Sequence, residues 1–180
     1  SLFVYYVLKS YFSFFWNGKL SQNIFVLREN ISRFAQVSCN HCPYAQAVWP
    51  RVIRLGAYAK GMKVGAVAIN PNINPDYPDD APEKMIEKIK ELGIPFPYLV
   101  DETQDVAKAF KAQCTPDVYL FNKDRELFYH GRIDDNWKDE EAVTREELKE
   151  ALNNMAAGLP ADKKQFPSMG CSIKWRAGAG

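Results

Sequence analysis

The stretch Cys39-Asn40-His41-Cys42-Pro43 predicts both the fold and the chemistry of this chain. Two cysteines at this spacing can form a reversible disulfide when they lie at the start of a helix. Pro43 favours a helix start, because its fixed φ fits a first turn and its missing N–H is not needed there. We expect Cys39 as the exposed N-cap and Cys42 one turn further in, with the helix dipole and a charged His41 lowering the pKa of Cys39.

A zinc site is the main competing interpretation of two cysteines at this spacing. A structural zinc site needs two more ligands at a similar spacing. Cys114 and Cys171 each stand alone in the sequence, and His130 is the only other histidine. The cysteine pattern therefore favours redox chemistry, and we expect neither a metal nor a cofactor.

The 180 residues carry a net charge of +1, and basic and acidic residues are interleaved. This length fits one domain with its own core, and the charge pattern predicts no nucleic-acid surface. Four cysteines are too few for a disulfide scaffold, so we expect the cytoplasm, with the periplasm or an N-terminal anchor as alternatives. The aromatic stretch 2–16 is too interrupted for a membrane span and lacks signal-peptide features, so no membrane contact is expected.

Segments with strand and helix patterns alternate along the chain, which predicts a mixed sheet with helices on both faces. Arg33 and Gln36 make the second strand a poor candidate for a buried central position, and Pro50 should kink the first helix. Thr144-Arg145-Glu146-Glu147 resembles a capping box. Strands are expected at 23–27, 31–38, 62–69, 96–100, 117–121 and 126–129, and helices at 43–60, 83–92, 103–111 and 144–157.

Cys114-Thr115-Pro116 precedes the predicted hairpin of strands 117–121 and 126–129. A cis bond before Pro116 would leave the backbone of Thr115 as a short edge with which a substrate peptide could pair, beside the two cysteines. We expect this bond to be cis. Cys114 is expected to be a small buried residue, although its position also places it near the redox pair.

Seven segments together resemble the thioredoxin superfamily, and within it the peroxiredoxin-like AhpC/TSA-type redoxins that carry a thioredoxin-style Cys-x-x-Cys. The resemblance covers residues 38–176 and implies an α/β, thioredoxin-like fold, with an extra β–α insertion before the cis-proline strand. We divide the chain into an atypical N-terminal segment (1–37), a thioredoxin-like domain (38–157) and an irregular tail (158–180). The segments are Cys39-Asn40-His41-Cys42-Pro43-Tyr44, Ala68-Ile69-Asn70, Pro95-Phe96-Pro97-Tyr98-Leu99, Asp101-Glu102-Thr103-Gln104, Cys114-Thr115-Pro116-Asp117, Gly131-Arg132-Ile133-Asp134-Asp135-Asn136-Trp137 and Gly170-Cys171-Ser172-Ile173-Lys174-Trp175.

The resemblance implies thiol–disulfide exchange or antioxidant reduction. Our first hypothesis is a thiol–disulfide oxidoreductase in which Cys39 attacks a substrate disulfide and Cys42 resolves the mixed disulfide. His41 would tune the pKa of Cys39, while Thr115 and Pro116 would hold the substrate. The expected partners are disulfide-bearing proteins or small thiols, with an electron donor of the thioredoxin or glutathione type.

Two alternatives remain open at the level of sequence. One is a thiol peroxidase that uses Cys42, although Cys39 and Ala35 stand where true peroxiredoxins have Thr or Ser and Pro. The other is a binding module that holds a soft metal with the two sulfurs and His41.

Two further segments of the resemblance have no settled role. Cys171 is a candidate third redox cysteine that could swing toward Cys42 or Cys39, or a plain surface thiol. Residues 131–137 could shape the rim of the active site, but a turn with one aromatic packed on the core is the simpler interpretation.

Overall fold

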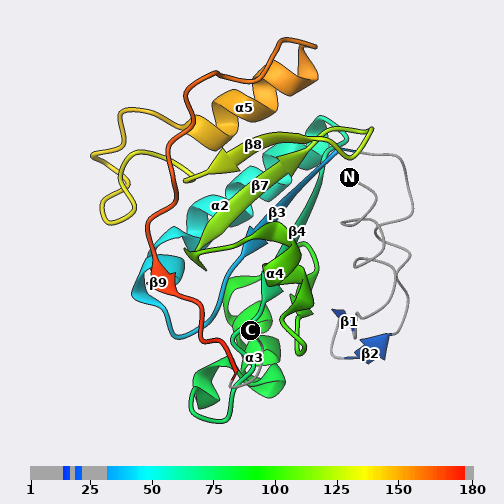
Figure 1. Ribbon diagram of the computed structural model, residues 1–180, viewed down its shortest axis with the longest axis vertical. Coiled ribbons are helices and arrows are strands. Elements are labelled where there is room, and N and C mark those ends of the chain that lie inside the picture. The colour runs from blue at the N-terminus through cyan, green and yellow to red at the C-terminus, as the bar shows by residue number, and fades with distance from the viewer. Residues whose placement is uncertain (1–13, 17–18, 22–31, 177–180) are drawn as a thin grey trace.

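The computed structural model describes residues 14–16, 19–21 and 32–176, and five strands of this range form one mixed sheet in the order β5-β4-β3-β7-β8 (Figure 1). β4 lies parallel to β3 and β5, whereas β7 lies antiparallel to β3 and β8. This arrangement confirms the expected mixed sheet. Its strands are β3 (Arg33–Val37), β4 (Gly65–Asn70), β5 (Tyr98–Val100), β7 (Asp117–Phe121) and β8 (Leu127–Gly131).

Helices cover both faces of the sheet (Figure 1). Residues of α2 (Pro43–Gly61), α3 (Pro82–Leu92) and α5 (Glu147–Ala156) share one apolar cluster with one face of the sheet. Residues of α4 (Asp105–Phe110) share a second cluster with the opposite face. Alternate side chains of each strand point to opposite faces, so the apolar strands can supply both clusters.

The central strand β3 differs from the sequence-based expectation. Arg33 and Gln36 argued against a buried strand here, yet β3 has a partner strand on each side and Gln36 is fully buried. The Gln36 side chain donates a hydrogen bond of 3.1 Å to Ser38 Oγ. Residues 33–37, which the sequence analysis assigned to the N-terminal segment, therefore belong to the sheet.

The other elements agree with the expected order, with shifted ends. Two strand–helix units, β4–α3 and β5–α4, lie between α2 and Pro116, as the expected insertion requires. The predicted capping box at the start of α5 is wrong, because the helix begins after Glu146 and not at Thr144. The Thr144 backbone N–H instead donates a 2.9 Å hydrogen bond to Asp135 Oδ1. The antiparallel strands β1 (Phe14–Trp16) and β2 (Lys19–Ser21) precede the sheet. The strand expected at 23–27 lies outside the described residues.

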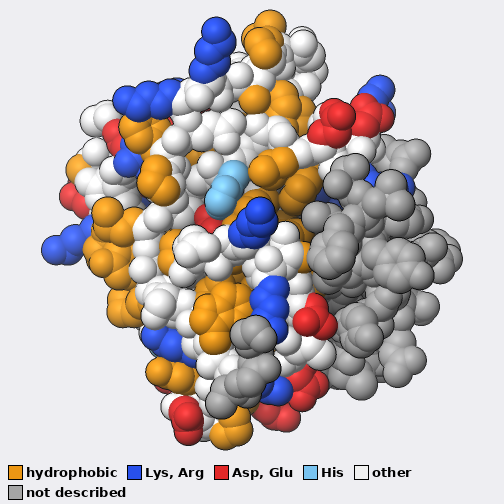
Figure 2. Space-filling view, in the orientation of Figure 1, with side chains coloured by type: hydrophobic (Ala, Val, Ile, Leu, Met, Phe, Trp, Pro, Cys, Tyr) orange, Lys and Arg blue, Asp and Glu red, His pale blue; other side chains and the backbone are white. Residues whose placement is uncertain are grey.

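The segment after α5 is more ordered than an irregular tail. It runs past β8 and forms the short strand β9 (Cys171–Ser172), which pairs antiparallel with β6 (Cys114–Thr115) (Figure 1). Ile173 follows β9 and is buried in the cluster that contains α4. On the face drawn in Figure 2, basic and acidic side chains of the described residues are interspersed with apolar ones.

Candidate active site

Both cysteines of the 39–42 stretch lie at the start of α2, and both are 0% exposed. Cys42 is the N-cap residue and Pro43 is the first helical residue, so the helix begins as predicted. The expected N-cap position of Cys39 is wrong, because Cys39 lies three residues before the cap. Its expected exposure is also wrong.

Thr115 joins the two cysteines to the strand before Pro116. The Cys39 Sγ atom lies 3.2 Å from Thr115 Oγ1, and the Cys42 Sγ atom lies 3.1 Å from the Thr115 carbonyl oxygen. The Thr115–Pro116 peptide bond is cis, which confirms the expectation. Thr115 therefore brings together the two cysteines and Pro116, all of them predicted site residues.

Cys171 lies at the same site and not in a free tail. Its Sγ atom is 2.8 Å from the Sγ atom of Cys42, and both residues are free cysteines in this structure. The pairing of β9 with β6 places Cys171 directly opposite Thr115. Of the three sulfur-bearing residues at the site, Cys171 alone is partly exposed.

Asp80 is a site residue that the sequence analysis missed. Its side chain is fully buried and accepts hydrogen bonds from the backbone N–H groups of Asn40, at 2.5 Å, and His41, at 3.3 Å. The His41 ring pairs with the second oxygen of the same carboxylate through Nδ1. His41 also stacks on Tyr77, with 5.0 Å between ring centroids. The imidazole is thus held by Asp80 and Tyr77.

Asn40 is the second residue that the sequence analysis missed. Its side-chain amide donates a 2.9 Å hydrogen bond to the carbonyl oxygen of Asp79 and accepts one of 3.2 Å from the Tyr98 hydroxyl. Its own carbonyl oxygen accepts a 2.7 Å hydrogen bond from the Gln46 side chain. These contacts hold the loop between the two cysteines in one conformation.

The thiol pKa values differ strongly between the two cysteines. The pKa of Cys42 is lowered to about 4, because the Cys39 thiol donates to its sulfur and further hydrogen bonds from Cys171 and Ala45 outweigh burial. The pKa of Cys39 is raised, because its proton is held by Cys42, its sulfur is buried and Asp80 carries a negative charge nearby. In this structure the thiolate therefore belongs to Cys42, in contrast to the low pKa expected for Cys39.

Cys39, His41 and Asp80 form the one potential metal-ligand group found among the described residues, with ligand atoms within 4.8 Å of one another. This group differs from the two sulfurs and His41 of the metal-binding alternative, since Asp80 takes the place of Cys42. His41 Nδ1 is already engaged by Asp80. The group offers three ligands, fewer than a closed structural zinc site needs.

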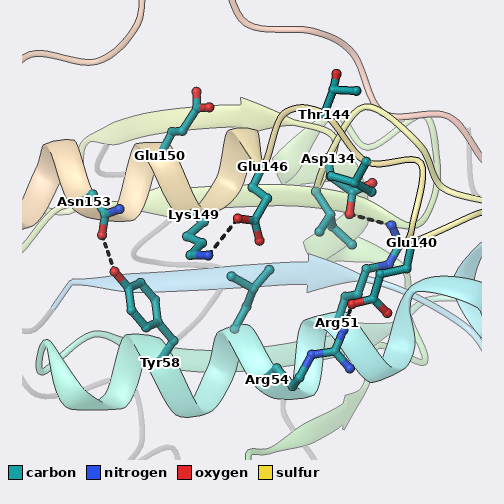
Figure 3. Close-up of a pocket in the computed structure, with 13 residues that line it drawn as sticks. Arg51, Arg54, Tyr58, Asp134, Glu140, Thr144, Glu146, Lys149, Glu150 and Asn153 are labelled. Carbon is teal, nitrogen blue, oxygen red and sulfur yellow. Dashed lines mark hydrogen bonds and ion pairs between the residues drawn. The ribbon is translucent and has the colours of Figure 1, made fainter.

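A cleft of about 630 Å³ lies between α2 and α5, away from the cysteines (Figure 3). Its charged side chains pair with one another, as Arg54 does with Glu140 and Lys149 with Glu146. At one end, Arg51 binds Asp134 Oδ2 at 2.6 Å and the Trp137 carbonyl oxygen at 2.6 Å. Residues 131–137 are thus anchored to α2, and Arg132, Asp134 and Trp137 line a second, smaller pocket together with Pro116.

The comparisons with known proteins place this chain in a family. The sequence model of the AhpC/TSA family matches residues 28–130, more than half of the chain. The chain belongs to the AhpC/TSA family. Its thioredoxin-like fold confirms the resemblance to thioredoxin-superfamily redoxins, and no match was found among curated proteins. Among the described residues, none of the helices is both long and apolar enough to cross a membrane.

Three solved structures illustrate the range of similarity within the redoxin fold. An uncharacterized conserved protein from Geobacillus kaustophilus is 43% identical, with a TM-score of 0.77 over 83% of this chain and 79% of that one. A hypothetical protein from Sinorhizobium meliloti is 34% identical, with a TM-score of 0.78 over 83% and 82%. A thiol-disulfide isomerase from Corynebacterium glutamicum is 16% identical, with a TM-score of 0.60 over 79% and 91%, and shares the fold.

Proposed function

We propose that this redoxin is a thiol–disulfide oxidoreductase that cycles between a Cys39–Cys42 dithiol and the corresponding disulfide. The observation that carries the proposal is the contact of both sulfurs with Thr115 at the start of α2. A substrate disulfide gains two electrons and leaves as two thiols. The cysteine pair loses two electrons and the one proton on Cys39, and the second proton comes from solvent. Membership of the AhpC/TSA family and the likeness to a thiol-disulfide isomerase support this proposal.

The site residues have distinct roles in the proposal. Cys42 provides the thiolate of the reduced pair, and Cys39 holds the proton that is lost when the disulfide closes. Asp80 positions His41 and the loop backbone, and Thr115 contacts both sulfurs from β6. Protein disulfides or small disulfides are the proposed substrates, with an electron donor of the thioredoxin or glutathione type.

A redox titration tests this proposal directly. The full chain is equilibrated in glutathione buffers of increasing oxidised fraction, and its cysteine peptides are mapped by mass spectrometry. We expect a single two-electron transition that produces a Cys39–Cys42 disulfide, with a potential inside the roughly −270 to −120 mV range of known pairs. Cys39→Ser and Cys42→Ser should each abolish that disulfide, whereas Cys114→Ser should keep it. A chain that forms no reversible Cys39–Cys42 disulfide would contradict the proposal.

A thiol peroxidase is the second candidate, because Cys42 combines a lowered pKa with membership of the AhpC/TSA family. In that reaction the Cys42 thiolate would attack a hydroperoxide, forming a sulfenic acid and releasing an alcohol or water. Peroxide consumption that survives Cys39→Ser but not Cys42→Ser would favour this candidate. No peroxide consumption by the wild-type protein would exclude it.

A further inference from the structure

We propose that β9 is an internal substrate: it occupies the peptide-binding edge of the redox site and presents Cys171 to Cys42 as the thiol through which outside disulfides exchange with the buried pair. The inference rests on the proposed Cys39–Cys42 couple and adds a third cysteine to its electron path. Three independent observations carry it: strand pairing, the sulfur contact and the burial of the pair.

The first observation is that the edge beside Thr115 is already occupied. The sequence analysis assigned the Thr115 backbone to pairing with an incoming peptide. In the structure the partner is the chain itself, since Cys171 and Ser172 pair antiparallel with Thr115 and Cys114. An extended segment that adds to an exposed strand in this way is a general mode of peptide recognition.

The close approach of Gly170 to β6 shows how tightly this segment is seated. A Cβ atom at Gly170 would collide with the carbonyl oxygen of Thr115 and lie 3.0 Å from the backbone nitrogen of Pro116. Glycine is therefore the residue that lets the segment reach the site. On the other side of β9, the side chain of Ile173 is buried in the core.

The second observation is the position of the sulfur atoms. The Cys171 Sγ atom lies 2.8 Å from Cys42 Sγ, so a modest adjustment would bring the two to bonding distance. Cys114, the fourth cysteine, makes its hydrogen bond to the carbonyl oxygen of Pro116 at 3.4 Å and lies in β6 itself. Cys171 is therefore the partner that the structure offers to Cys42 besides Cys39.

The third observation concerns access. Cys39 and Cys42 are 0% exposed, whereas Cys171 is partly exposed. With β9 in place, a disulfide from solution has no surface of the pair to meet. Cys171 is the sulfur-bearing residue at the site that it can reach. Electrons would thus leave the pair through Cys171.

The exchange balances without an additional reactant. The Cys171 thiol attacks an outside disulfide and passes its proton to the departing sulfur, which forms a mixed disulfide and releases one thiol. The Cys42 thiolate then attacks the Cys171 sulfur, which forms Cys42–Cys171 and releases the second product as a thiolate. Finally Cys39 loses its proton and attacks the Cys42 sulfur, which forms Cys39–Cys42, while Cys171 leaves and takes up that proton. The outside disulfide has gained two electrons, the pair has lost two, and Cys171 is regenerated.

The test uses full-length protein and oxidised glutathione as the probe. In Cys39→Ser the path stops at its second step, so peptide mapping should find a Cys42–Cys171 disulfide. A Cys39→Ser protein that carries glutathione on Cys42, with Cys171 still a free thiol, would overturn the proposal. The double variant Cys39→Ser with Cys171→Ser is the control, and it should not form an internal disulfide.

A rate measurement distinguishes the proposed exchange through Cys171 from the proposed Cys39–Cys42 disulfide itself. Cys171→Ser should slow oxidation of the Cys39–Cys42 pair by oxidised glutathione roughly ten-fold or more, with the equilibrium potential of the pair unchanged. An unchanged rate would overturn the exchange through Cys171 and leave the proposed function intact. If the wild-type chain forms no Cys39–Cys42 disulfide at all, the proposed function itself fails.

Gly170→Ala tests the seating of β9 without altering a cysteine. The added methyl group cannot fit against Thr115, so β9 should lift from β6 and expose the pair. In this background the oxidation rate should no longer depend on Cys171. Gly61→Ala is the matched control, because a Cβ there meets nothing within 4 Å, and it should leave the dependence on Cys171 intact. A Gly170→Ala protein that still depends on Cys171 would contradict the assignment of β9 as the cover.

Discussion

Asp80 links three groups of the loop that carries the cysteines, and its charge acts directly on the redox pair. It holds the backbone N–H groups of Asn40 and His41 and the His41 ring, while its charge helps to raise the pKa of Cys39. His41 was expected to lower the pKa of a neighbouring thiol through its positive charge. In the structure a buried acid that pairs with His41 has the opposite effect on Cys39.

Asp80→Asn should therefore make Cys39 more acidic. The amide keeps the shape and an acceptor oxygen but removes the negative charge that disfavours the Cys39 thiolate. In the Gly170→Ala background, in which the pair should be open to reagent, we expect Asp80→Asn to accelerate alkylation of Cys39 at mildly alkaline pH roughly ten-fold, followed by mass spectrometry of the reduced protein. Asp79→Asn is the matched control, because the exposed Asp79 contacts the loop only through its backbone, and it should change nothing. A rate that Asp80→Asn leaves unchanged in this background would show that the charge of Asp80 does not reach Cys39.

Cys42 should titrate as a thiolate through the whole neutral range. Its pKa is lowered to about 4, so the ultraviolet thiolate absorbance of the reduced protein should persist at neutral pH and disappear only as the pH falls through that value. Cys42→Ser should remove this absorbance. Cys114→Ser should leave it unchanged, because burial raises the pKa of Cys114 to about 12. An absorbance that survives Cys42→Ser would assign the thiolate to another cysteine.

Among individual residues, those with a local signature were predictable and those brought in by the fold were not. The spacing of Cys39, Cys42 and Pro43 predicted a redox helix, and that prediction in turn led us to expect the cis bond before Pro116. Asp80 has no such signature, because it lies in a loop rich in Pro, Asn and Asp nearly forty residues from the cysteines. The signal that could have found it is its place just before α3, at the end of the parallel-strand edge where such loops meet.

At the level of elements, strand β3 shows why the local sequence pattern gave the wrong prediction for the central strand of the sheet. Gln36 is polar, yet its side chain bonds Ser38 locally and the strand gains backbone hydrogen bonds on both sides. The Gln36 side-chain oxygen has no hydrogen-bond partner, so the strand is central although one buried polar atom stays unsatisfied. The capping box failed for a similar reason, because a tertiary contact with Asp135 replaced the local cap at Thr144.

Helix α2 continues from Pro43 to Gly61 although Pro50 lies within it. An interior proline removes one helical hydrogen bond and crowds the preceding turn, at about 3 kcal/mol. Pro50→Ala should therefore raise the free energy of unfolding by roughly 1–3 kcal/mol, measured by urea denaturation of the reduced protein. Pro82→Ala is the control, because Pro82 is at the first position of α3, where proline is tolerated. No gain from Pro50→Ala would mean that the surrounding packing compensates for the missing bond.

At the scale of the whole molecule, the segment after α5 acts as a strap that joins distant parts of the fold. Residues 165–168 bind β8, β9 pairs with β6, and Ile173 is buried against the α4 face. Beyond Ile173, the Arg176 backbone N–H donates a 2.9 Å hydrogen bond to the side chain of Gln104. The strap therefore fixes Cys171 from both directions along the chain.

Ile173→Ala should loosen this strap. Truncation of a buried isoleucine costs about 2–5 kcal/mol, and here much of that loss falls on the docking of β9. We expect native-state alkylation of Cys42 and Cys171 to accelerate at urea concentrations that leave the sheet folded. Met169→Ala is the matched control on the same strap, since Met169 is 60% exposed, and it should not accelerate labelling. Labelling that accelerates only with global unfolding would show that the strap and the sheet unfold as one unit.

The alternation of strands and helices was readable from sequence, because hydrophobic periodicity is local, and it gave the mixed sheet and its two helical faces. The path of the strap was not. Residues 158–176 are polar and rich in Lys, Pro and Gly, which indicates an irregular tail. Their contacts are scattered hydrogen bonds, a two-residue strand pairing, an ion pair between Asp162 and Arg145, and the buried Ile173, and no periodic pattern encodes these.

The strap also has a consequence for the solubility of the folded chain. β8 is the outer strand of the sheet, and its outward backbone groups are met by residues 165–168: Gln165 bonds the His130 N–H and the Phe128 carbonyl, and the Phe166 carbonyl accepts from Arg132. An outer strand with free backbone groups invites pairing with the same strand of another molecule. Loss of the strap would thus expose both the cysteine thiols and the edge of the sheet to solvent. Oxidative cross-linking and strand-to-strand aggregation should therefore begin together.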